Sequence, residues 1–161
     1  MAGGAPRGRN PQNRLDGSRL IRRYPVVKLP PFFQRHHPWS ISFIIWFTTL
    51  WILSGRPLSG PKLPPLFHVD KFLHFGYFFG GAGLLSTVFF LQKKRTLHWS
   101  SLHLFVILAL FLVGSLDEWH QSWYPYRSGN DAGDLTADVI GALAGTLLFR
   151  ALQPKVFSLD A

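Results

Sequence analysis

The chain has 161 residues, of which 47% are hydrophobic and only 16% are charged, and it carries a net charge of +9. Soluble proteins have about 25% charged residues, so this composition argues against an ordinary soluble domain and against a disordered chain. The absence of cysteine excludes disulfides, thiolate zinc sites and cysteine nucleophiles.

The positive charge is concentrated in residues 1–38. This segment holds eight basic residues and a single acid, Asp16, and contributes +7 of the net charge. It is rich in Arg, Gly, Pro and Asn and has no helical period, which predicts a disordered, cytoplasmic tail. The rest of the chain carries little net charge, so we do not expect it to bind nucleic acid.

Two other interpretations of the tail stay open. Its basic residues could attract anionic lipid, or Arg22 and Arg23 could belong to a cleaved twin-arginine signal. The signal is the weaker interpretation, because four prolines separate the arginine pair from the first apolar run.

Four apolar segments follow the tail and predict an all-α membrane protein, a bundle of four transmembrane helices. The expected helices cover residues 39–54, 72–92, 97–116 and 135–152, and residues 153–161 form a short cytoplasmic tail. The first three segments carry no charge apart from histidines, and each is close to the roughly 20 residues that a spanning helix requires. The fourth is weaker, because it contains Asp138 and Arg150.

Small residues in two of these segments predict close helix packing. Gly76 and Gly80 are four residues apart in the second segment, and Ala137, Gly141 and Gly145 repeat at the same spacing in the fourth. This spacing places small side chains on one helix face, where a neighbouring backbone can approach closely.

The distribution of basic residues predicts the orientation in the membrane. Basic residues follow the second segment (Lys93, Lys94 and Arg95) and lie at the end of the fourth (Arg150 and Lys155). Basic loops stay in the cytoplasm, so we expect both termini to be cytoplasmic. The extracytoplasmic end then receives the stretches 55–69 and 117–134.

Six of the eight acidic residues collect at this extracytoplasmic end, although they come from three separate segments. They are Asp70, Asp117, Glu118, Asp131, Asp134 and Asp138. Lys71, His74 and Arg127 are expected beside them. Ionisable groups at membrane depth are energetically costly and usually mark a functional site.

These acids also have structural interpretations. Asp70 and Asp134 could be helix N-caps. Asp117 and Glu118 lie at a helix C-terminus, where the helix dipole disfavours acids by about 0.3–1 kcal/mol each, unless a second, short interfacial helix begins at Asp117. Asp138 lies one turn inside the membrane and is the hardest acid to explain as solvated surface.

The cluster suits three kinds of chemistry. Its carboxylates and histidines can bind a divalent metal, two close carboxylates can act as an acid–base pair, and Arg127 and Lys71 can bind a phosphate. No His-x-x-x-His pair indicates zinc and no cofactor motif is present, so metal and cofactor stay unassigned. The candidate catalytic residues are His74, Asp117, Glu118 and Asp134. The candidate ligand-binding residues are Asp70, Lys71, His120, Gln121, Arg127 and Asp138.

The ordered set of motifs resembles the VanZ-like membrane proteins, a family named for an accessory protein of teicoplanin resistance. The resemblance covers residues 66–148 and leaves the basic tail outside. It rests on Asp70-Lys71 with His74-Phe75 and Tyr77, on Asp117-Glu118 with His120-Gln121, and on Pro125-x-Arg127, Asp134 and Asp138 with Gly141-Ala142. The family implies a multi-pass protein of the bacterial cell (inner) membrane, but it supplies no reaction.

Three functional hypotheses follow. The leading one is an outward pocket that binds the anionic head group of a membrane lipid or a lipid-linked cell-wall precursor, through Lys71, His74 and Arg127, with the acids orienting these cations. The second is an intramembrane hydrolase or transferase acting on a lipid-linked phosphate, with His74 or His120 moving protons. The third is a structural or assembly protein, in which the polar residues join the helices.

Overall fold

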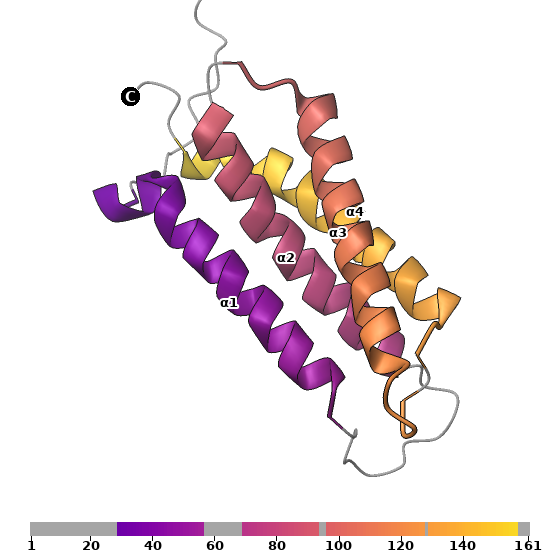
Figure 1. Cartoon of the computed structure of the whole chain (residues 1–161). Helices are drawn as coiled ribbons and strands as arrows, with labels where there is room; N and C mark the ends of the chain where they lie inside the picture. The colour runs from indigo at the N-terminus through magenta and orange to yellow at the C-terminus, as the bar shows by residue number, and fades with distance from the viewer. Residues whose placement is uncertain (1–28, 57–68, 94–95, 128, 158–161) are drawn as a thin grey trace, which may run out of the picture.

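The structure is a computed structural model that describes residues 29–56, 69–93, 96–127 and 129–157. Of the tails predicted at 1–38 and 153–161, residues 1–28 and 158–161 lie outside the described residues. The prediction is wrong for the parts next to the bundle, because residues 31–34, 36–38 and 153–156 are helical. The described part is helical, with a short 3-10 helix η2 (Pro31–Gln34) followed by α1 (His36–Ser54), α2 (Val69–Lys93), α3 (Trp99–Gln121) and α4 (Ala132–Val156). The four α-helices form a bundle (Figure 1), which confirms the all-helical prediction.

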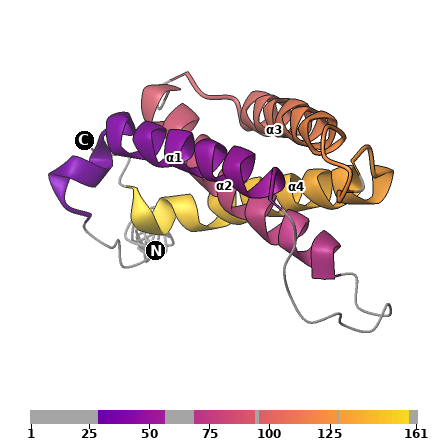
Figure 2. The ribbon, with the colours of Figure 1, turned by 60° about the horizontal axis from the view of Figure 1, so that its bottom comes forward.

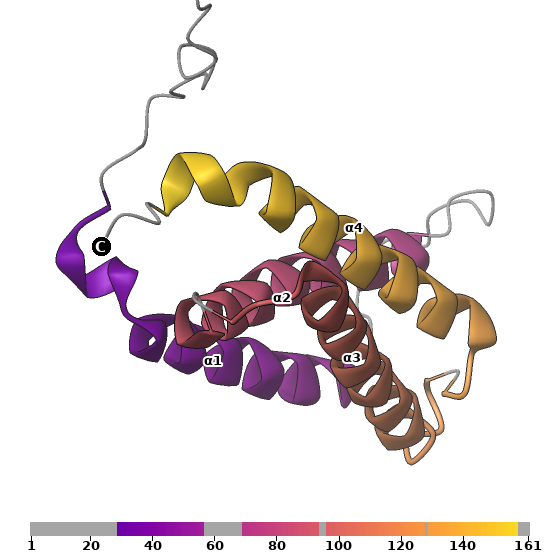
Figure 3. The ribbon, with the colours of Figure 1, turned by 90° about the horizontal axis from the view of Figure 1, so that it is seen from above.

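Helix α2 lies between α1 and α4 (Figure 3). Helices α1 and α3 run in one direction and α2 and α4 in the other, so the end of α1, the start of α2, the end of α3 and the start of α4 meet at one end of the bundle. We call this the site end; it lies at the bottom of Figure 1 and comes forward in Figure 2. The predicted polar segments are therefore brought together in space.

Three of the four helices, α2, α3 and α4, are long and apolar enough to cross a membrane. Helix α1 is not among them: it has 19 residues and opens with His36, His37 and Pro38. The prediction of membrane helices is thus confirmed for three of the four segments.

The helices extend beyond the apolar runs at the site end. Helix α2 already begins at Val69, and α3 continues to Gln121 instead of ending at 116. The apolar runs underestimate the helix lengths at this end. The polar side chains of these turns form hydrogen bonds and ion pairs with one another, so the chain can stay helical here without exposing them to water. The alternative of a separate interfacial helix beginning at Asp117 is wrong, since α3 is continuous there.

The N-cap of α4 is Asp131 and not Asp134. The Asp131 side chain accepts a hydrogen bond from the backbone N–H of Gly133 at 2.6 Å, which satisfies a free N–H of the first turn. Asn130 just before it has a left-handed backbone with φ of 67°, a conformation that asparagine tolerates better than most residues. Asp134 is left free to point into the bundle.

Helix α4 rests on α2 through two glycines. Gly141 and Gly145 lie against the backbone carbonyls of Phe75 and Phe79, and a β-carbon at either glycine would collide with those oxygens. The prediction for the fourth segment is confirmed in this respect. The prediction of close packing for the second segment is wrong, because Gly76 and Gly80 are exposed and no described atom lies within 4 Å of a β-carbon built there.

Gly141→Ala should lower the free energy of unfolding by about 1–3 kcal/mol, the usual cost of forcing an extra methyl group into a packed contact. Gly76→Ala is the matched control, since it adds the same methyl group to open space on a helix and should be neutral or stabilising. Thermal melting of the purified proteins in detergent would measure both. Equal stability of the two variants would contradict the close contact between α2 and α4.

Candidate functional site

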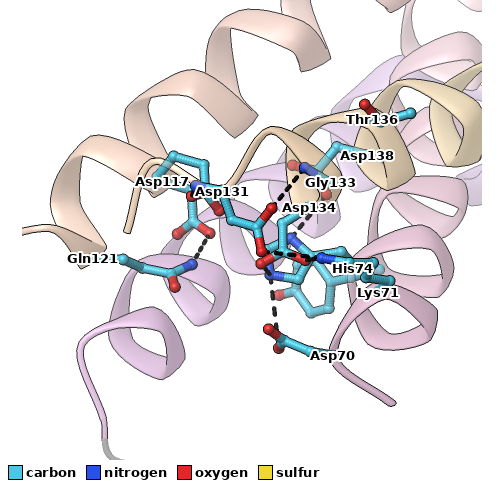
Figure 4. Close-up of polar contacts among 12 residues, drawn as sticks. Asp70, Lys71, His74, Asp117, Gln121, Asp131, Gly133, Asp134, Thr136 and Asp138 are labelled. Atoms are coloured by element: carbon cyan, nitrogen blue, oxygen red, sulfur yellow. Dashed lines mark hydrogen bonds and ion pairs between the residues drawn. The ribbon is translucent and has the colours of Figure 1, made fainter. Parts of the chain in front are cut away.

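Ten polar residues from α2, α3, α4 and the turn before α4 form a cluster at the site end (Figure 4). The polar cluster consists of Asp70, Lys71, His74, Asp117, Glu118, Gln121, Arg127, Asp131, Asp134 and Asp138. Helical spacing helps to assemble it, because residues four apart share one face of a helix. The structure thus brings together nine of the ten predicted site residues, His120 being the exception.

Lys71 links α2 to the start of α4. Its Nζ donates to Asp134 Oδ1 at 2.8 Å and to Asp131 Oδ2 at 3.0 Å. The hydrogen bond from Lys71 and that from the Gly133 N–H lower the pKa of the Asp131 carboxyl below its ordinary value. Two carboxylates share the lysine, so two of its three ammonium N–H donors are used within the protein.

His74 is oriented by a carboxylate from α4. Its Nδ1 lies 2.9 Å from Asp138 Oδ1, while its Nε2 lies 3.9 Å from Asp134 Oδ2 and 4.0 Å from Asp70 Oδ1. Asp138 is completely buried. Gly114 of α3 makes room for it, because a β-carbon at Gly114 would lie 2.6 Å from Asp138 Oδ2.

The acids at the end of α3 find donors that offset the unfavourable helix dipole. Asp117 Oδ2 accepts from Gln121 Nε2 at 2.8 Å, and Gln121 Oε1 in turn accepts from Arg127 Nη2 at 2.7 Å and Nε at 3.1 Å. Glu118 Oε2 accepts from the backbone N–H of Asp131 at 2.6 Å. Asp117 and Glu118 thus each accept a hydrogen bond through one of their two carboxylate oxygens.

Three buried carboxylate oxygens have no hydrogen-bond partner among the described residues. They are Asp117 Oδ1, Glu118 Oε1 and Asp138 Oδ2. An unpaired buried acceptor costs about 1–3 kcal/mol, and more when it is charged. Each of these three carboxylates is therefore hydrogen-bonded through one oxygen and left without a described partner at the other.

His120 belongs to a different environment. Its Nδ1 lies 2.9 Å from Ser54 Oγ of α1, and its ring stacks on Trp51 with 4.0 Å between centroids. Its Nε2 lies 3.4 Å from the Tyr124 hydroxyl. The side chain is buried between α1 and the turn after α3, and it packs these elements together rather than joining the polar cluster.

A cavity of about 430 Å³ opens over the polar cluster. Five residues of the polar cluster line it: Asp70, His74, Asp117, Gln121 and Arg127. The rest of the lining is largely apolar and comes from α1 and α2, namely Leu50, Leu53, Leu73 and Tyr77, with Ser54 and Arg56. The lining residues of α1 were missed from the sequence, since that segment is nearly uniformly apolar.

Asp131 was counted among the acids but was not chosen as a site residue. Its position just before Gly133, at the start of a helix, is a sequence signal for an N-cap. The structure adds that its side chain binds Lys71 and its backbone N–H binds Glu118. It thus links α2, α3 and α4 at a single residue.

Lys71→Gln should lower the free energy of unfolding by about 1–3 kcal/mol, because it leaves the buried Asp134 carboxylate without its charged donor. Lys93→Gln, at the exposed far end of the same helix, is the control and should have little effect. Lys71 also pairs with Asp131, whose pKa is lowered in the folded protein. The contribution of the Lys71–Asp131 pair to stability is therefore complete above the ordinary carboxyl pKa and is lost as the pH falls through the pKa of the folded state. Melting curves at neutral and acidic pH would test this, and an equal effect of the two lysine variants at neutral pH would contradict it.

The comparison with known proteins gives the family of the chain. The family profile described as VanZ/LLP1 matches residues 6–153. Searches of curated proteins and of solved structures gave no match. The expectation that the basic tail lies outside the family resemblance is wrong, because the match already begins at residue 6; the polar motifs had drawn attention to the last three helices alone. The chain, with its three long apolar helices, is a membrane protein that belongs to the VanZ/LLP1 family.

Proposed function

We propose that the chain crosses the bacterial cell membrane four times and that α1 is the remaining span. Its 19 residues give a helix of about 28 Å, close to the roughly 30 Å of a hydrocarbon core. Ile41, Ile44 and Ile45 are 57%, 62% and 60% exposed, which suits a surface covered by lipid chains. The helix is also fixed to a spanning neighbour, because Trp46 and Tyr77 exchange side chain-to-backbone hydrogen bonds of 3.1 and 2.6 Å.

The site end faces the outside of the cell in this proposal. Lys93 and Lys155 lie at the opposite end, in the last turns of α2 and α4, and Arg150 lies six residues before the end of α4. Positively charged helix ends stay on the cytoplasmic side. Both termini are then cytoplasmic, and the cavity opens toward the lipid head groups and the cell-wall precursors of the outer leaflet.

We propose further that the cavity binds the anionic head group of a membrane lipid or of a lipid-linked envelope precursor. The observation that supports this is the mixed lining of the cavity, to which α1 and α2 contribute leucines and the polar cluster contributes charged and polar groups. A molecule with an acyl chain and a charged head matches such a lining. If its ligand is a cell-wall precursor, a contribution to glycopeptide resistance or envelope homeostasis follows.

Arginine provides the anion-binding groups of the cavity. Arg127 directs Nε and Nη2 to Gln121, while its Nη1 makes no hydrogen bond to the described residues. Arg56 lies exposed at the rim. Arginine presents its donors as a planar fork that fits a phosphate. Lys71, which the leading hypothesis included, has its charge shared between Asp131 and Asp134 and is assigned a structural role instead.

A second candidate function is hydrolysis or group transfer on a lipid-linked phosphate. It is favoured by the pair of His74 and Asp138, because a carboxylate that holds one ring nitrogen leaves the other to act as a general base. Turnover distinguishes the two functions: purified protein that binds a polyprenyl phosphate and returns it unchanged is a binding protein, and release of phosphate would show an enzyme.

Arg127→Ala should weaken the binding of phosphatidylglycerol or polyprenyl phosphate by about tenfold or more, since one charge-assisted hydrogen bond contributes about 1.5–3 kcal/mol. Arg127→Lys keeps the charge and loses the fork, so its affinity should lie between those of the wild type and the alanine variant. Arg150→Ala, at the opposite end of the bundle, is the control. Native mass spectrometry in detergent would measure the affinities, and equal binding by all four proteins would contradict the proposal.

A further inference from the structure

We propose that the polar cluster binds one divalent transition-metal ion through His74, Asp117 and Glu118. One ligand atom from each of these residues lies within 4.8 Å of the other two. The three residues are 8%, 1% and 4% exposed, so the site is inside the bundle and not on its surface. They come from two different helices, α2 and α3, which fixes their spacing.

The unpaired oxygens of the cluster point to a cation. Asp117 and Glu118 each have one oxygen held, by Gln121 and by the Asp131 N–H, and each has its second oxygen buried without a partner among the described residues. A buried carboxylate oxygen without a donor is unfavourable unless a cation takes the donor's place. The hydrogen bonds on the first oxygens orient the second ones, as expected of carboxylates that each give a metal one ligand atom.

Asp138 acts as a positioning residue for His74. A histidine that ligates a metal commonly donates its other ring N–H to a carboxylate, which fixes the tautomer and the orientation of the ring. The 2.9 Å contact between His74 Nδ1 and Asp138 Oδ1 has this form and leaves Nε2 as the nitrogen for the metal.

A second set of residues, Asp70, His74 and Asp134, also has ligand atoms within 4.8 Å of one another. It shares His74 with the first set and is the weaker candidate for two reasons. The Lys71 ammonium already neutralises Asp134 at 2.8 Å and would repel a second cation. The Asp70 side chain is 37% exposed, so water can solvate it.

The charge of the cluster and its donor atoms indicate the class of metal. Six acids face only two permanent cations, Lys71 and Arg127, so a divalent ion would reduce a large excess of negative charge. A ligand set of one imidazole nitrogen and two carboxylates suits Zn²⁺, Mn²⁺ or Fe²⁺ better than Mg²⁺ or Ca²⁺, which prefer oxygen alone. This inference concerns the same cavity as the proposed function but requires no lipid ligand.

The test is metal binding by the full-length protein, purified in detergent, stripped with a chelator and titrated with Mn²⁺ and Zn²⁺ without added lipid. We expect one ion per chain, and at least about a tenfold loss of affinity in Asp117→Asn and in Glu118→Gln. Asp70→Asn distinguishes the two sets of residues, because it removes a ligand of the second set only. Electron spin-echo spectra of bound Mn²⁺ should contain a nitrogen coupling that His74→Gln removes. Thermal melting of each variant confirms that it is folded.

Three results would overturn the inference: no saturable binding by the wild type, unchanged affinity in both Asp117→Asn and Glu118→Gln, or a loss in Asp70→Asn as large as in Glu118→Gln. The last result would place the ion in the second set. Because no lipid is added, failure here leaves the head-group proposal standing, and failure of the Arg127 experiment leaves the metal site standing.

Discussion

The contact between α2 and α4 determines the rest of the structure. Gly141 and Gly145 let α4 approach the backbone of α2, and the two helices run in the same direction. Their first turns therefore lie side by side, and this brings Asp134 to Lys71 and Asp138 to His74. A larger residue at either glycine would separate the helices and, with them, the groups that form the polar cluster.

The same contact makes ionised groups tolerable inside an apolar bundle. Lys71 serves two carboxylates, Arg127 reaches Asp117 through Gln121, and the backbone of Asp131 serves Glu118. These pairs stabilise the bundle whatever the ligand is, so the structural hypothesis and the functional ones are compatible. These pairs leave one oxygen on each of three carboxylates without a partner among the described residues, which a purely structural network would not require.

Much of the site could be predicted from the sequence, because helix direction alone places the ends of α1 and α3 beside the starts of α2 and α4. Helix direction located nine residues of the polar cluster without any side-chain geometry. Helix direction failed where the rotation of a helix matters: a β-carbon at Gly76 or Gly80 would meet no described atom within 4 Å, and His120 faces α1. Hydropathy gives length and direction but not the face of a helix, and the contribution of α1 to the cavity depends on that face.

The opening of the polar cluster toward the outside of the cell can be measured directly, because the chain has no cysteine of its own. Single cysteines at Ser122, exposed at the site end, and at Gln92, exposed at the other end, would be treated in intact cells with a membrane-impermeant maleimide. Labelling at 122 and not at 92 is the predicted result. Labelling at 92 and not at 122 would turn the cavity toward the cytoplasm and contradict binding of outer-leaflet head groups.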